Sequence, residues 1–180
     1  MREFGRVDWL VYGAWVGLMA GLALASLAFL LVGSRAGAAF PAEAYLLPLG
    51  AAIFTVAIAV DTIGHRTIYK EVLRGGEALV HHVTIGTGIG ACVLLLTAYP
   101  QRTGVAVVAG VLTALSFVYS LVDEVMHWRR YLQGNSDVVE MWSHVFMLVG
   151  HGTMMAGWWR WYWLGYPGVR EALPALGLGA

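Results

Sequence analysis

The sequence has little charge and a single cysteine. Charged residues make up 12% of the 180 residues and hydrophobic residues 59%, whereas a soluble domain has about 25% charged and about 45–50% apolar residues. A chain of this composition cannot cover its surface in water, which excludes a soluble enzyme and a disordered chain. Lysine plus arginine and aspartate plus glutamate are 11 each, so the chain has no basic footprint for nucleic acid. Cys92 alone excludes a disulfide framework and a cysteine-based metal site.

Five long apolar segments predict an all-α integral membrane protein, with residues 1–180 as a single transmembrane domain. A spanning helix needs about 20 apolar residues, and the 23 glycines are typical of closely packed transmembrane helices. The first segment is too long for a signal-peptide core, so we expect it to be retained. Short links make consecutive helices antiparallel neighbours, with helices two to five in a bundle and the first helix outside it. The predicted spans are 9–32, 45–60 with a polar helical extension to 72, 78–98, 104–122 with an extension to 131, and 138–163.

The distribution of lysine and arginine predicts the orientation of the chain. Seven of them lie at the N-terminus and in the links at 61–77 and 123–140, and four lie on the opposite side. Because cytoplasmic segments carry the excess of positive charge, we expect the N-terminus and the links on its side to face the cytoplasm of a bacterial or archaeal cell. The aromatic run at 158–163 is then expected to form an interfacial belt that anchors the fifth helix.

An internal repeat contains five of the six histidines. Each unit has Asp-x3-His at the end of one helix and Glu-x3-His at the start of the next, and residues four apart lie on one face of a helix. The units cover about residues 45–98 and 104–163. The eight residues of the pattern are Asp61, His65, Glu77 and His81 in the first unit, and Asp123, His127, Glu140 and His144 in the second.

Antiparallel neighbours place the two ends of each link at the same depth. We therefore expect Asp61 to lie level with His81, and Asp123 level with His144, so that all eight side chains face one layer. Ionisable residues at the edge of a span are costly, and a cluster of them indicates a functional site. The acids outside the pattern are expected to be solvated: Glu71, Glu124 and Asp137.

The donor set indicates a metal site, because imidazole and carboxylate without thiolate suit copper(II), iron, zinc and manganese. Several functions remain open. A di-iron or other di-metal carboxylate oxidase or oxygenase would use Glu77 and Glu140 as ligands. A b-type haem protein would ligate iron through histidines on facing helices. A divalent-metal transporter or delivery protein would bind the ion in transit, and a structural or assembly subunit would use the same side chains only for hydrogen bonds.

The stretch Asp61-Thr-Ile-Gly-His65 is followed by a polar link and a histidine at the start of the next helix. It resembles the metal motif in the C subunit of the copper membrane monooxygenases, the particulate methane and ammonia monooxygenases. The second unit, from Asp123 to His127, is similar, with Asp123 where the family has asparagine. The resemblance covers about residues 55–155.

This resemblance implies copper as the favoured metal, while iron and zinc remain alternatives on the donor set. It implies two copper sites, one on Asp61, His65 and His81 and the other on Asp123, His127 and His144. The remaining carboxylates would orient the imidazoles. It also implies partners in the bilayer, either other membrane subunits or further copies of the chain. The implied reaction inserts oxygen into a small apolar substrate such as an alkane or ammonia, with a quinol or a similar reductant.

Overall fold

Helices build the described part of the chain, which contains no strand. The computed structural model describes residues 5–63, 76–99, 103–134 and 138–178. The elements are α1 (Arg6–Arg35), the short 3-10 helix η1 (Ala42–Tyr45), α2 (Leu46–Ile63), α3 (Gly76–Thr97), α4 (Thr103–Leu132), α5 (Val138–Trp163) and α6 (Val169–Ala175). The all-α prediction is confirmed, and α5 has the predicted bounds. Neither η1 nor α6 was predicted, and the predicted extension over 64–72 lies outside the described residues.

Among the described residues, four helical segments are long and apolar enough to cross a membrane. They are Tyr12–Arg35, Ala42–Ile63, Leu79–Thr97 and Thr103–Leu132, with mean hydropathies from 1.8 to 2.3. Leucine and valine side chains cover their outer faces, for example Leu24 at 68% exposure, Val56 at 65% and Leu96 at 63%. Long helices that expose so much apolar surface indicate a lipid environment.

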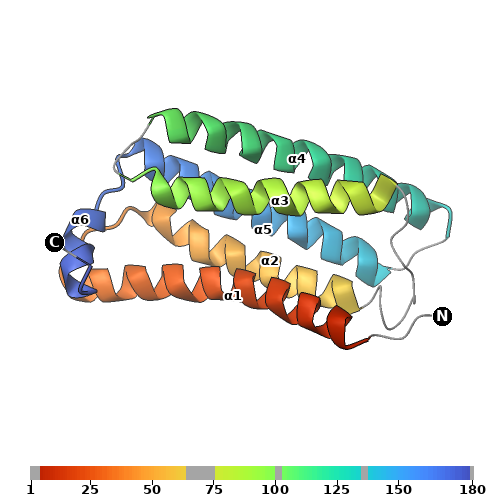
Figure 1. Ribbon diagram of the computed structural model, residues 1–180, viewed down its shortest axis with the longest axis horizontal. Coiled ribbons are helices and arrows are strands. Elements are labelled where there is room, and N and C mark those ends of the chain that lie inside the picture. Colours follow the sequence, from red (N-terminus) through yellow and green to blue (C-terminus); the bar gives the residue numbers. More distant parts are fainter. Residues whose placement is uncertain (1–4, 64–75, 100–102, 135–137, 179–180) are drawn as a thin grey trace.

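Consecutive long helices run in opposite directions, with α1 on the outside against α2 and α6 (Figure 1). The main pairs are α2 with α5 and α3 with α4, and α4 also contacts α5. The prediction that consecutive helices are neighbours is therefore wrong for α2 and α3, whose described residues barely touch. The first repeat unit is instead joined to the second through both of its helices.

Glycines bring α2 and α5 into close contact. A β-carbon on Gly150 would lie 2.6 Å from the backbone nitrogen of Phe54. Gly50 faces the same interface, where a β-carbon would collide with the backbone of Gly150 and Met154. Because backbone atoms cannot move aside as the end of a flexible side chain can, these positions accept glycine alone. This close approach explains why α2 packs along α5 and not along the helix that follows it.

An apolar core fills the end of the bundle next to α6. Trp158, at 2% exposure, and Trp161, at 7%, belong to this core. The indole nitrogen of Trp161 donates to the carbonyl oxygen of Pro167 at 3.1 Å. These two tryptophans are therefore not members of the predicted interfacial belt, whereas Trp163 is 67% exposed. Successive helical residues point about 100° apart, so a run of aromatic residues on α5 necessarily divides between the core and the outer surface.

Candidate metal centre

Polar side chains gather toward the other end of the bundle, where α2 and α4 end and α3 and α5 begin. Five of these residues, from α2, α4 and α5, are 0–9% exposed: Asp61, Glu124, His127, Glu140 and His144. The side chains of His81 on α3 and Asp123 on α4 are 19% and 14% exposed. Burying so many ionisable groups is costly unless they pair with one another or with a cation.

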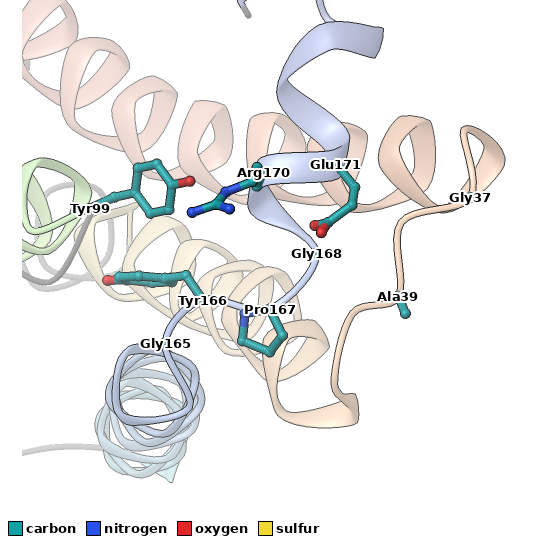
Figure 2. Close-up of a pocket in the computed structure, with 9 residues that line it drawn as sticks. All are labelled: Gly37, Ala39, Tyr99, Gly165, Tyr166, Pro167, Gly168, Arg170 and Glu171. Carbon is teal, nitrogen blue, oxygen red and sulfur yellow. The ribbon is translucent and has the colours of Figure 1, made fainter.

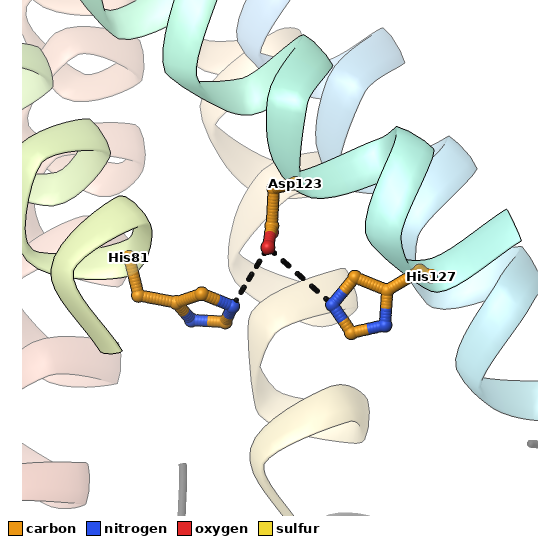
Figure 3. A group of neighbouring side chains, drawn as sticks. All are labelled: His81, Asp123 and His127. Atoms are coloured by element: carbon orange, nitrogen blue, oxygen red, sulfur yellow. Dashed lines mark ion pairs between the residues drawn. The ribbon is translucent and has the colours of Figure 1, made fainter. Parts of the chain in front are cut away.

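His81, Asp123 and His127 bring three donor atoms together (Figure 3). Nε2 of His81 lies 3.1 Å from Oδ1 of Asp123, and Nε2 of His127 lies 3.5 Å from the same oxygen. All three donor atoms lie within 4.8 Å of one another. Asp123 and His127 are one turn apart on α4, and His81 reaches them because α3 packs along α4. We call these three residues the triad.

The spacing of the triad fits a shared metal ion. Two ligands held about 2.1 Å from a tetrahedral ion lie about 3.4 Å apart, close to the observed 3.1 and 3.5 Å. Nε2 of His81 and Oδ1 of Asp123 are buried, and neither makes a hydrogen bond within the described part of the chain. Donor atoms that converge without hydrogen-bonding one another are what a metal site requires. The residues present therefore fit a bound metal ion.

Glu140 holds the imidazole of His127 from its other side. With the proton on Nδ1, His127 donates to Oε1 of Glu140 at 2.6 Å, and Nε2 keeps its lone pair on the side of Asp123. Metal-binding histidines commonly donate their second nitrogen to a carboxylate in this way. The guanidinium of Arg130 donates to the same Glu140 oxygen at 2.8 Å and lies 2.6 Å from Nδ1 of His127. Glu140 therefore favours the proton on Nδ1 of His127, and Arg130 holds the Glu140 carboxylate in place through its own hydrogen bond.

His144 links the triad to α2. Its Nδ1 donates to Oε1 of Glu124 at 3.3 Å and lies 3.6 Å from Oδ2 of Asp123. Its Nε2 lies 3.4 Å from Oδ1 of Asp61. The rings of His144 and His127 are 3.5 Å apart between centroids. One carboxylate oxygen of Asp123 therefore faces the two histidines of the triad, and the other oxygen faces His144.

The aspartate–histidine contacts cross between the repeat units. Asp123 lies near His144 of its own unit, as predicted, but its shorter contact is to His81 of the first unit. Asp61 was expected level with His81, and the structure places it in contact with His144 of the second unit. The cause is the helix pairing: α3 packs on α4 and α2 packs on α5.

The formal charges of this group require cations. In the described part of the chain, four carboxylates face one guanidinium and three imidazoles. With neutral imidazoles the group carries three net negative charges, which is unfavourable in a largely buried site. Three protons on the imidazoles would balance this charge. A divalent metal ion and a single proton would balance it equally well.

The structure brings together six of the eight predicted site residues: Asp61, His81, Asp123, His127, Glu140 and His144. His65 and the side chain of Glu77 lie outside the described residues, so their assignment stays a prediction. The expectation that Glu124 is solvated is wrong, because it is 9% exposed and accepts a hydrogen bond from His144. Helix α4 contacts both α3 and α5, so adjacent acids about 100° apart can each meet a different helix. The sequence contained a signal for this contact: Asp123 and Glu124 are adjacent acids, and Asp123 was expected at the depth of His144.

His151 lies two turns deeper on α5 and is separate from the triad. It is 5% exposed, and its Nε2 lies 3.3 Å from the hydroxyl of Ser116. Its ring stacks on Phe117, with centroids 4.3 Å apart and planes 5° from parallel. These contacts are those of a packed core histidine.

Comparison with known proteins finds no family model, no curated protein and no solved structure that matches this chain. The likeness to the copper monooxygenase subunit therefore rests on the repeated motifs alone and stays a prediction.

Proposed function

We propose that this protein is a membrane metalloprotein that holds a redox-active transition metal on His81, Asp123 and His127. The observation that carries the proposal is the convergence of three donor atoms from two helices, two of which are buried without a hydrogen bond. Two imidazoles and one carboxylate leave coordination positions open, as in metal sites that act on oxygen. A metal bound there would supply electron exchange and a position for a small ligand.

The surrounding residues of the chain prepare this site. Glu140 fixes the ring and tautomer of His127, and His144 approaches the second oxygen of Asp123. Burial of these groups excludes bulk water, which strengthens their electrostatic interactions with a bound cation. The geometry is therefore that of a resident metal ion. Apolar core side chains such as Ile58, Ala91 and Met154 pack between the metal centre and the far end of the bundle, which supports a resident ion over transport of the ion.

Copper is the metal that we propose first, on the resemblance of the two motifs to the copper membrane monooxygenases. The protein would then be the metal-bearing subunit of a membrane oxygenase that acts on a small apolar substrate, with other membrane subunits or further copies of itself. An iron oxygenase or oxidase is the second candidate. The observation that favours it is the donor set of the triad, since two histidines and one carboxylate are also the typical ligands of non-haem iron(II).

We further propose that α5 crosses the bilayer together with the four apolar helices, which gives five spans. Its 26 residues extend for about 39 Å at 1.5 Å per residue, and it packs along α2, one of the apolar spans. The metal centre then lies at the membrane face that holds the start of α1, which the charge distribution assigns to the cytoplasm.

Metal analysis of the purified protein tests the proposal. We expect about one copper or iron ion per triad in the wild type, measured by elemental mass spectrometry on protein in detergent. His81→Ala and His127→Ala should each lose most of this metal, because two remaining ligands seldom hold an ion. His82→Ala is the matched control, since His82 is the exposed neighbour of His81 and lies outside the triad.

The electron spin resonance spectrum of the same samples distinguishes copper(II) from iron. Wild-type protein without metal after loading with copper(I), copper(II) and iron(II) would overturn the proposal. Equal metal content in the wild type and in the His81→Ala/His127→Ala double variant would do the same, because the metal would then be bound elsewhere.

A further inference from the structure

Two cavities meet at the end of the bundle opposite the metal centre. The first has a volume of about 660 Å³ and is lined by Tyr99, Tyr166, Gly168, Arg170 and Glu171, among others (Figure 2). The second, of about 370 Å³, is a groove bordered by α1 and α3 with Trp158 and Trp161 in its wall. Both volumes lie in the range of about 300–1,000 Å³ that is usual for small-molecule sites. The cavities share Tyr99 and Tyr166 in their walls, so they are adjacent, and we consider them as two compartments of one site.

The first compartment carries two opposite charges. The side chain of Arg170 extends toward Tyr99 and Tyr166, and that of Glu171 points to the other side of the cavity (Figure 2). In the described part of the chain, the side chains of Arg170 and Glu171 form no ion pair or hydrogen bond. The Tyr99 hydroxyl likewise has no hydrogen-bond partner there. The compartment therefore presents a cation, an anion and a hydroxyl to a ligand.

The second compartment is lined mainly by apolar side chains, and the hydroxyls of Tyr166 and Ser26 in its wall are already hydrogen-bonded. The hydroxyl of Tyr166 donates to the carbonyl oxygen of Leu95 at 3.0 Å, and burial raises the pKa of Tyr166 to about 12, so it remains neutral. The hydroxyl of Ser26 donates to the carbonyl oxygen of Leu22 at 2.7 Å within its own helix. Ala25 and Leu96 line the groove and are exposed on the outer surface. The groove therefore opens toward the lipid phase.

We propose that this space binds one zwitterionic phospholipid of the ethanolamine type. The phosphate is held by Arg170 and the Tyr99 hydroxyl, the ammonium group by Glu171, and one acyl chain lies in the groove. Three features support this occupant. The two charges match the two ends of the headgroup, the groove matches a hydrocarbon chain, and the cavity lies at the end of the spanning helices, where lipid headgroups meet the protein. A quinone also has a polar head and an apolar tail, but its head is neutral and would not pair with the two opposite charges of the cavity.

Native mass spectrometry of the full chain in detergent tests the site. After lipid removal, phosphatidylethanolamine is titrated back, and we expect one tightly retained lipid per chain. Arg170→Ala should weaken its binding by about tenfold or more, as loss of a hydrogen bond to a charged group does. Ala25→Phe should have a similar effect by filling the groove. Arg35→Ala and Ala28→Phe, at exposed positions outside both cavities, should leave binding unchanged. Because Arg170 and Ala25 are exposed, both variants should fold, which circular dichroism checks.

The headgroup assignment has its own test. Glu171→Gln should weaken phosphatidylethanolamine, while phosphatidylglycerol, which has no ammonium group, should be unaffected by this change. Glycerophosphoethanolamine, which lacks the acyl chains, should bind far more weakly than the lipid. Wild-type affinity in both Arg170→Ala and Ala25→Phe would overturn the proposal, as would displacement of the lipid by an equimolar isoprenoid quinone. These results do not depend on whether the triad binds metal.

Discussion

Substitution of Glu140 distinguishes a copper-type centre from a di-metal carboxylate centre. Glu140 contacts Nδ1 of His127 and not the side of the ring that faces Asp123, so it orients a ligand and is not one itself. Glu140→Gln keeps a hydrogen-bond acceptor but removes the charge. We expect metal to be retained with an affinity about 10–100-fold lower, as for other carboxylates behind metal-binding histidines. Competition with a chelator of known affinity measures this change.

Glu43→Gln provides the comparison for that experiment, because Glu43 lies at the far end of the bundle in an exposed pair with Arg160, 3.6 Å away. Its metal affinity should equal that of the wild type. Complete loss of metal from Glu140→Gln would make Glu140 a direct ligand and would favour a di-metal carboxylate centre over the copper type.

The charge balance of the site predicts that protons leave as metal enters. A divalent ion can replace two of the three imidazole protons without changing the net charge of the group, and ligating imidazoles must be neutral. We therefore expect up to about two protons to be released per ion when the imidazoles are protonated before binding. Affinity should then fall steeply as the pH is lowered. Calorimetric titrations in buffers of different ionisation enthalpy count the protons, and a heat that is independent of the buffer would contradict this assignment.

At the scale of the helices, the contact between α2 and α5 determines which residues meet at the site. Gly150→Ala would place a β-carbon 2.6 Å from the backbone nitrogen of Phe54. Forcing the helices apart should cost about 1–3 kcal/mol, the usual penalty for overpacking, and should move Asp61 away from His144. Gly152→Ala is a matched control on the same helix, because a β-carbon there meets nothing within 4 Å. Thermal unfolding in detergent compares the two, and equal stability would show that the interface is not tightly packed.

The contact between α2 and α5 also shows which features of the site the sequence could not predict. The spacings of the second unit correctly placed Asp123 with His127 and Glu140 with His144 on one helix face, because that depends only on helical geometry. The corresponding pairs of the first unit stay predictions, since His65 and the side chain of Glu77 lie outside the described residues. The spacings did not indicate that Asp61 would meet His144, since this depends on which helices pack together. That choice follows from Gly50 and Gly150, whose backbones come together from distant parts of the chain. In a sequence with 23 glycines, the two that form this contact carry no distinguishing local signal.

At the scale of the whole molecule, hydropathy predicted the α-helical membrane class but not the differences within α5. Trp158 is a core residue while Trp163 is exposed on the same helix. Burial there depends on α2 and η1, which pack against this end of α5, and on Phe29 of α1, whose ring lies beside Trp161. Composition also gave no indication of the cavity beside Arg170, because α6 and the turn before it form this cavity and neither was predicted.

The number of spans is the remaining prediction for the whole molecule. If α5 crosses the bilayer, a reporter placed after Gly134, beyond α4, and a reporter placed at the C-terminus must lie on opposite sides. A fluorescent protein that matures only in the cytoplasm should be bright after Gly134 and dark at the C-terminus, and a phosphatase that is active only outside should show the reverse. The distribution of positive charge favours an orientation with the N-terminal side in the cytoplasm, because seven of the eleven lysine and arginine residues lie on that side. Equal fluorescence at both positions would mean that α5 does not cross.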